Sequence, residues 1–340
     1  MYKFRKINLQ LFAEVGATNT TGTVSAEMQT HYNKTLIDRA GPHLVHEQFA
    51  AKRNLPLRAG ATVDFRCVEA LPKATTPLEE GVTPAPGKVV VTNKRATVEQ
   101  YGSYVPVSDK LELMAADPII VEMTEKSGDQ MGLTRDTIIR DIMNLGTQVM
   151  YVPSRAADGT VTEVQERKAL TLNCKITVKD VQRAVARLRM MNAPTIDGKH
   201  YGCIINPAIE LDIMDPDGGW WDANKYATPE NIKEGEIGRM AGVRFFTSSE
   251  AKIFNDETCP DGLAVYSCLF FGKDAYAVTD LEGAGTEMII KPKESGGTAN
   301  PLNLYGTIGW KTLFTGVILS DEYLLRMECT SSAFPAPAAN

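Results

Sequence analysis

The chain has 340 residues, of which 43% are apolar and 23% charged, and its net charge is −6. These values are ordinary for a globular protein with a sizeable core, arranged as one large domain or two modest ones. The acidic balance argues against a coat that binds nucleic acid through overall positive charge, although it allows a local basic patch.

Six cysteines are spread along the chain without any CxxC pair. This spacing predicts reduced, mostly buried thiols and not a disulfide framework. No apolar run approaches the roughly 20 residues that a membrane span needs. The first 15 residues start basic and turn apolar, but Asn8 and Gln10 interrupt the apolar part. We therefore expect no signal peptide.

Residues 1–55 are loosely patterned, with a short helical pattern over 25–36. His43 and His46 form an HxxH beside a Gly-Pro pair. A metal site of this kind needs further ligands, and neither HExxH nor a nearby cysteine supplies them. We expect ordinary polar loop histidines.

A half-buried strand is predicted over residues 60–68, because Val63, Phe65 and Cys67 alternate with polar residues. A polar, strand-like arm follows, with β-prone runs at 88–98 and 100–107. Its tip, residues 75–88, holds three prolines and the adjacent glutamates Glu79 and Glu80. Since a two-stranded arm is marginal alone in water, we expect it to pack on another copy of the chain.

A long helix is predicted from Ser108, a plausible N-cap, to the stop signal at 144–146. Pro118 interrupts or restarts it. Its apolar stripe has spacings of three and four and consists of Ile120, Met123, Ser127, Met131, Thr134, Ile138, Ile142 and Leu145. Its final 27 or so residues span about 40 Å, longer than a small core needs. Gly128 and Gly132 would let another backbone come close.

A second helix is predicted over 177–191, with Thr177 and Asp180 approximating a capping box. Its basic residues are interpreted as a solvated face, with nucleic-acid contact as the alternative. After residue 194 the pattern changes to short strands and turns, with one helical piece at 207–214 and a β-prone run at 304–329. The sequence therefore predicts an α+β fold without a repeated βαβ pattern.

No catalytic constellation emerges from the motifs. Residues 81–88 resemble a phosphate loop, but the glycine spacing is wrong and Val89 replaces the magnesium-binding hydroxyl. Residues 215–219 echo a calcium loop that lacks its later acidic ligands. GxSxG is absent. The adjacent Trp220 and Trp221 are interpreted as a packing or subunit contact. We expect no enzyme activity, no cofactor and no metal.

Several ordered segments resemble one known family. They are INLQLFA near the start, RNLPLRAGATVDF (53–65), TPLEEGVTPAPGK (76–88), VEQYGSYVPVSDKLEL (98–113), GLTRDTIIRDI (132–142), MAGVRFFTSSEAKIF (240–254), FFGKDAYAV (270–278), NPLNLYGTIGWK (300–311) and ILSDEYLLRMECTSS (318–332). Nearly the whole chain resembles the tailed-bacteriophage major capsid proteins with the HK97-type fold, specifically the branch named after the phage N4 coat protein.

The resemblance implies an N-arm, an extended β-hairpin called the E-loop, a long spine helix, and peripheral and axial domains. The implied division is an N-arm at 1–55, the E-loop at 56–107, a peripheral domain at 108–199 with its spine helix at 108–146, an axial domain at 200–270, return strands of the peripheral domain at 271–332, and a tail at 333–340. The helix at 177–191 is expected beside the spine helix.

The implied function is self-assembly through pentamers and hexamers into an icosahedral shell that encloses phage double-stranded DNA. The expected partners are further copies, the packaged DNA without sequence specificity, a portal, and possible scaffold and decoration proteins, with no membrane. The virion capsid is the expected location, after assembly in the bacterial cytoplasm.

The resemblance also places subunit contacts on particular residues. They are Glu79, Glu80, Lys88, Lys94 and Arg95 in the E-loop, Arg135 and Arg140 on the spine helix, and Trp220 and Trp221 in an axial loop. Neither Lys88 nor Lys94 matches the lysine that forms the HK97 cross-link, so no covalent chemistry is expected. Two other interpretations stay open: an oligomeric tail or surface-layer component, and an enzyme with a scattered site.

Overall fold

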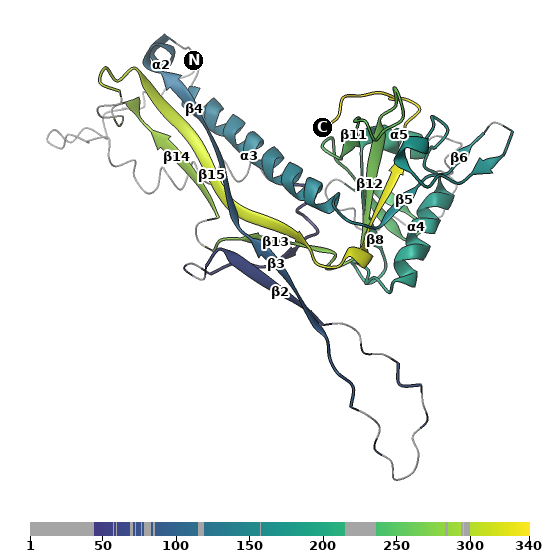
Figure 1. The fold of residues 1–340 in the computed structure, drawn as a ribbon. Helices are drawn as coiled ribbons and strands as arrows, with labels where there is room; N and C mark the ends of the chain where they lie inside the picture. The colour runs from purple at the N-terminus through teal and green to yellow at the C-terminus, as the bar shows by residue number, and fades with distance from the viewer. Residues whose placement is uncertain are drawn as a thin grey trace, which may run out of the picture.

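The computed structural model describes residues 44–340, apart from 57, 59, 69, 70, 72, 76, 78–82, 84, 85, 115–118, 157, 215–235, 283, 284, 294 and 296–299. Within these ranges the strands form a five-stranded sheet, a seven-stranded sheet and two two-stranded pairs. Figure 1 shows the two larger sheets in separate bodies that meet near the middle of the molecule, with the hairpin of β2 and β3 projecting below. No helix in the described ranges is long and apolar enough to cross a membrane.

The elongated body is built on β15 (Tyr305–Ile318), the longest strand. β4 (Glu99–Ser108) pairs antiparallel with it from Tyr305↔Ser108 to Phe314↔Glu99, and β14 (Thr286–Lys291) pairs on its other side. β13 (Tyr276–Asp280) continues along the end of β15, and β1 (Ala51–Lys52) adds in parallel to β13. Residues 100–107, expected in the arm, therefore belong to this sheet.

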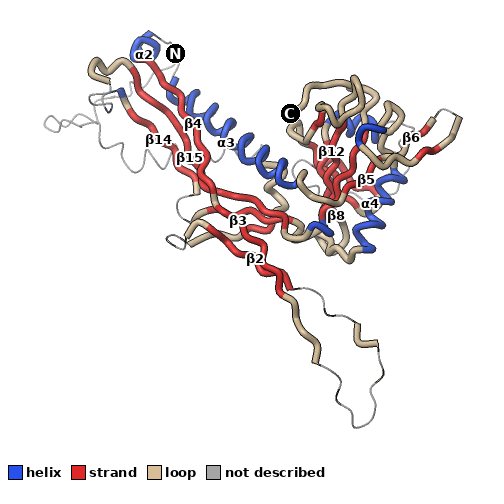
Figure 2. Tube along the Cα trace, viewed as in Figure 1, coloured by secondary structure: helices blue, strands red, loops and turns tan. Residues whose placement is uncertain are grey.

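The helical segment along this sheet begins where the sequence indicates. Ser108 Oγ accepts a hydrogen bond from the Leu111 N–H at 3.3 Å, so the predicted N-cap is confirmed at the start of α2 (Asp109–Met114). α3 (Ile119–Met143) then runs along one face of the sheet (Figure 2). Met131 is buried there against Trp310 and neighbouring apolar residues of the sheet.

The buried face of α3 differs from the predicted stripe in its second half. Ser127 and Met131 are buried as expected, but the next turns bury Arg135, Ile139 and Met143. Thr134, Ile138 and Ile142 lie to one side and are half-buried. The stripe was misplaced because charged residues, which an apolar pattern assigns to the solvent side, occupy the core face.

The projecting hairpin pairs β2 (Thr62–Val68) with β3 (Val91–Thr97), from Thr62↔Thr97 to Val68↔Val91. The alternation predicted for β2 is confirmed at Val63 and Phe65, which are buried. These side chains and Ala96 pack with Leu55 and Ala277 at the base of the hairpin.

The second body contains the seven-stranded sheet. Its order is β5 (Val149–Tyr151), β16 (Leu324–Cys329), β12 (Val265–Phe271), β8 (Tyr201–Ile205), β10 (Val243–Thr247) and β9 (Glu236–Met240), with β11 (Ile253–Phe254) paired to β12. β6 (Ser154–Arg155) and β7 (Val161–Thr162) form a small hairpin beside it. The short 3₁₀ helices η2 (Arg167–Ala169) and η5 (Asp321–Tyr323) precede α4 and β16 respectively.

Two helices, α4 (Val178–Met190) and α5 (Pro207–Met214), complete the core of this body. The predicted capping box is present, since the Asp180 carboxylate accepts bonds from the Thr177 N–H and hydroxyl at 3.0 and 2.7 Å. α4 packs its apolar face against β8, β12 and β16. The expectation that it lies beside the long helix is wrong, because this apolar face is covered by the sheet of its own body.

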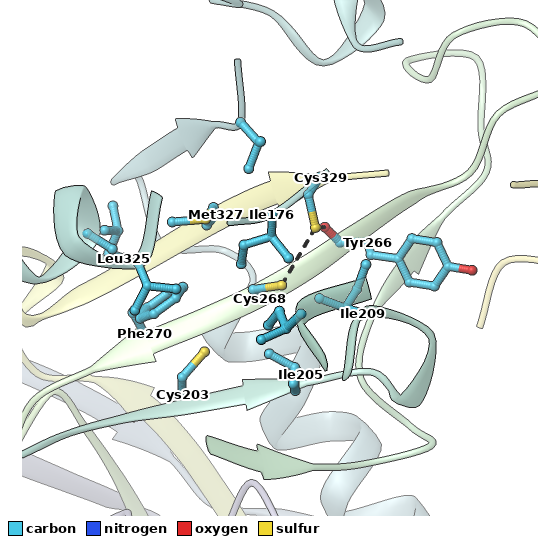
Figure 3. Close-up of a cluster of buried hydrophobic side chains, with 14 of the residues drawn as sticks. Ile176, Cys203, Ile205, Ile209, Tyr266, Cys268, Phe270, Leu325, Met327 and Cys329 are labelled. Atoms are coloured by element: carbon cyan, nitrogen blue, oxygen red, sulfur yellow. Dashed lines mark hydrogen bonds between the residues drawn. The ribbon is translucent and has the colours of Figure 1, made fainter. Parts of the chain in front are cut away.

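Residues 271–332 divide between the two bodies. β13, β14 and β15 lie in the elongated body, whereas β16 lies between β5 and β12 in the other. The expectation that the whole segment returns to one sheet is therefore wrong for β16. Its alternate side chains, including Leu325 and Met327, complete the core shown in Figure 3.

All six cysteines are free, and five of them are buried, as expected from their spacing. Cys203, Cys268 and Cys329 lie in the core of the second body (Figure 3). The sulfur atoms of Cys268 and Cys329, on neighbouring strands, are 3.7 Å apart. Burial raises the pKa of the Cys203 thiol, and so these thiols act as apolar core groups.

Candidate subunit interface

The hairpin exposes apolar residues beyond its base. Val89, Val90 and Val91 are 51%, 49% and 52% exposed, and Leu71 is 59% exposed. Of the β3 residues only Ala96 is buried. A contiguous exposed apolar run on a projecting segment is typical of a surface that a partner covers.

The same hairpin carries exposed positive charge. Lys88 and Lys94 are exposed, and Arg95 donates to Asp64 across the strand pair at 2.8 Å. This bond lowers the pKa of the Asp64 carboxyl and raises that of Arg95. Since the pair is solvent-exposed, it adds little to stability. Lys88 and Lys94 remain as exposed cations of the hairpin. Glu79 and Glu80 lie outside the described residues.

The outer side of the first half of α3 is acidic. Glu122 is exposed, and Glu125 and Asp129 follow it at helical spacings of three and four. Lys126 lies 3.7 Å from Asp129 and is the basic residue among them. Val121, beside Glu122, is 43% exposed. This face therefore combines negative charge with apolar surface, the complement of the hairpin.

The face of the elongated sheet opposite α3 contains a shallow groove of about 450 Å³ between β4, β14 and β15. Met288, Ile308 and Trp310 contact α3, so the alternating residues Ile289 and Gly309 point to the groove. Tyr104, which also lines it, is 71% exposed. Glycine at position 309 lets β4 approach β15 closely, because a Cβ there would lie 2.9 Å from the Ser103 carbonyl oxygen.

A second apolar surface lies at the far end of the elongated body. Leu113 and Met114 of α2 are 75% and 74% exposed, and Leu302 and Leu304 are 75% and 53% exposed. The two segments adjoin, since the Asp109 N–H donates to the Leu304 carbonyl at 2.9 Å. The apolar surfaces are thus spread over the hairpin, the sheet face and this end, as several separate contacts would require.

Arg135 and Arg140, expected as subunit contacts, are buried within the chain and only 5% and 1% exposed. Arg135 binds Glu47 and Asp280, with its closest contact to each at 2.9 and 2.8 Å. Arg140 donates to the Glu250 carbonyl at 2.7 Å. The expectation is corrected because these guanidinium groups already bind acceptors of their own chain. Trp220 and Trp221 lie outside the described residues.

His46 is a buried structural residue. Its Nδ1 lies 2.7 Å from the Asp136 carboxylate, its backbone N–H donates to the same carboxylate, and its carbonyl accepts from Tyr276 Oη. His43 lies outside the described residues. Within the described ranges, no group of three or more His, Cys, Asp and Glu side chains is arranged to hold a metal ion.

No protein-family model matches the sequence, and no curated protein matches it. Solved structures do match the fold. The capsid of Ralstonia phage GP4 is 13% identical, with a TM-score of 0.67 over 87% of this chain and 90% of that one. The chain has the HK97-like capsid fold.

Two further structures extend the similarity to this capsid fold. The capsid of cyanophage P-SCSP1u is 13% identical, with a TM-score of 0.60 over 84% of this chain and 87% of that one. The head structure of Helicobacter pylori bacteriophage KHP40 is 9% identical, with a TM-score of 0.58 over 97% of this chain and 98% of that one. Membership of the branch named after the phage N4 coat protein stays a prediction.

Proposed function

We propose that this chain is the major capsid protein of a tailed phage and assembles through pentamers and hexamers into an icosahedral shell around double-stranded DNA. The observation that carries the proposal is the capsid fold, which covers 87% of this chain and 90% of the Ralstonia phage GP4 capsid chain. Its role is structural and not enzymatic.

The parts of the fold take corresponding roles in this proposal. The hairpin of β2 and β3 is the E-loop, α3 is the spine helix, the elongated body is the peripheral domain and the second body is the axial domain. Residues before 56 act as the N-arm, whose β1 joins the sheet of the elongated body through β13. The shell location, the assembly in the host cytoplasm, and the portal, scaffold and decoration partners belong to the same proposal.

The surface chemistry supports an arm that lies across a neighbouring copy. The hairpin presents Val89–Val91 beside exposed lysines, and the outer side of α3 presents Val121 beside Glu122. Contact between unlike surfaces of identical subunits is heterologous, so it closes into rings where the rotation allows. Several weak contacts together hold a subunit strongly in the shell, because once the first contact has formed the others are effectively intramolecular.

Reversing one charge on the arm tests this contact. We expect Lys94→Glu to slow assembly and to raise the subunit concentration that assembly needs. The reason is that a glutamate at this position would repel the acidic side of α3 on the neighbouring copy. Lys179→Glu is the matched control, because Lys179 is an exposed residue of α4 and the charge change is equal, and this variant should assemble normally. Light scattering measures both, and equal behaviour of the two variants would argue against the arm contact.

Electron microscopy of the purified chain tests the proposed function itself. Closed hollow particles, or discrete pentamers and hexamers, are the expected result. Fibres or tubes that never close would favour a tail or surface-layer component. A monomer at all concentrations would contradict the proposal and favour an enzyme with a scattered site.

A further inference from the structure

The last turn of α3 lies between the two bodies (Figure 1). Ile139 and Met143 are 1% and 0% exposed and belong to an apolar cluster with members from both sheets. Tyr276 and Phe314 represent the elongated body in this cluster. Other members come from β8, β10, β12 and β16 of the second body: Ile204, Phe246, Leu269, Phe271 and Leu324. The bodies therefore share a continuous core at this joint.

Asn144, one residue past α3, adds directional bonds to the joint. Its side-chain Oδ1 accepts from Ser267 Oγ on β12 at 2.6 Å, and its Nδ2 donates to the Arg140 carbonyl at 2.8 Å. Its backbone carbonyl accepts from the Arg326 guanidinium on β16. Asn144 and Ser267 are 7% and 1% exposed. One residue thus bonds the helix end to two strands of the other body.

Arg140 connects the last turn of α3 to a third part of the second body, the turn after β10. Its Nη1 donates to the Glu250 carbonyl, in the turn after β10, at 2.7 Å. Its Nη2 lies 2.9 Å from the Asp141 carboxylate. Lys252 Nζ, in the same turn region as Glu250, lies 3.3 Å from this carboxylate. The helix end is therefore held from three directions, by β12, by β16 and by residues 250–252.

Apolar contact and hydrogen bonding restrain such a joint differently. Apolar burial is non-directional, so the clustered side chains hold the bodies together but tolerate a small rotation. Hydrogen bonds weaken steeply with misalignment, and an unmade bond leaves a buried polar group uncompensated. The bonds of Asn144 and Arg140 consequently select one angle between the bodies.

We propose that Asn144, held by Ser267, Arg326 and Arg140, is a positioning residue that fixes the angle between the two bodies and thereby the curvature of the shell. The curvature part rests on the proposed shell function. All subunits of the shell have the same sequence, so a substitution that loosens the joint loosens it in every subunit. A loosened joint leaves the subunits folded but lets them close at more than one diameter.

The angle can be measured without any assembly. Spin labels at Lys126→Cys on α3 and Met190→Cys on α4 report the distance between the bodies, because these side chains are 78% and 83% exposed. A Cys67→Ser background removes the one native cysteine that is not buried. In unassembled subunits, Ser267→Ala and Asn144→Ala should broaden the distance distribution.

Ser331→Ala is the matched control, because Ser331 is also fully buried but bonds within the second body, to the Ala208 carbonyl. We expect it to lower thermal stability about as much as Ser267→Ala while leaving the distance distribution narrow. Unchanged distributions in Ser267→Ala, which removes a single hydroxyl and so should still fold, would overturn the positioning role.

Shell diameter tests the second half of the proposal. Cryo-electron microscopy should show several diameters for Ser267→Ala and a single diameter for the wild type and Ser331→Ala. A single wild-type diameter in Ser267→Ala would overturn the link to curvature. A wild type that never closes would instead refute the proposed function, while the spin-label result would still decide whether Asn144 sets the angle.

Discussion

Deletion of residues 75–88 should yield subunits that fold normally but form no stable shells. The base of the hairpin remains, because Val63, Phe65 and Ala96 pack on Leu55 and Ala277 below the deleted part. The eight remaining residues between β2 and β3, 69–74 and 89–90, suffice to close a hairpin. The deletion removes the tip of the arm with Glu79, Glu80 and Lys88. We expect the shortened arm, although it keeps Val89–Val91, to lose one of the several contacts that hold each subunit.

The measurements are thermal unfolding, for the fold, and electron microscopy with sedimentation, for assembly. A variant that replaces residues 75–88 by a Gly/Ser segment of equal length serves as the control for loop length. It should fail like the deletion if side chains of the arm make the contact. Normal shells from either variant, or outright aggregation of the deletion, would show that the role of the arm is misread.

Local patterns predicted the elements that depend on neighbouring residues. The alternation at Val63 and Phe65, the cap at Ser108 and the capping box at Thr177 and Asp180 all involve residues within a few positions of one another. Their chemistry is complete in the local sequence, and the structure confirms each of them.

Long-range pairing could not be predicted in the same way. Residues 100–107 have the β propensity of an arm, but β4 pairs with β15 across about two hundred intervening residues. β16 similarly follows β15 directly in the chain and yet joins the other sheet. The β propensity of a segment indicates that it can form a strand, but it does not identify the strand with which it pairs. The positions of β4 and β16 in their sheets therefore could not be predicted from the sequence.

The exposure of the arm could be predicted from the sequence, whereas its role as an interface stays a prediction. The exposed arm and its lysines follow from polarity and from the lack of a packing partner, and the structure places Lys88, Lys94 and Arg95 on the exposed hairpin. The buried Arg135 was missed because a charged residue on a helix normally indicates the solvent side. Its acceptors, Glu47 and Asp280, lie far away in sequence, so no local signal marked it.

Arg135→Ala should destabilise the subunit by about 3–5 kcal/mol, as expected when one partner of a buried ion pair is removed. Its guanidinium donates twice to Glu47, at 3.0 and 2.9 Å, and also to Asp280 and Thr312. Burial alone would lower the pKa of Arg135, but Glu47 and Asp280 outweigh it and raise the pKa. Without Arg135, the Glu47 carboxylate stays buried, and among the described residues its remaining ion-pair partner is Lys52, at 3.6 Å.

Chemical unfolding of the unassembled subunit measures this loss, and Arg183→Ala provides the control. Arg183 binds Glu163 at 3.0 Å, but these side chains are 45% and 60% exposed, so its removal should cost less than about 1 kcal/mol. Combining Arg135→Met with Glu47→Gln should recover part of the stability, because the second change removes the stranded charge. A stable Arg135→Ala subunit that fails only in assembly would restore Arg135 as a subunit contact and would contradict its buried role.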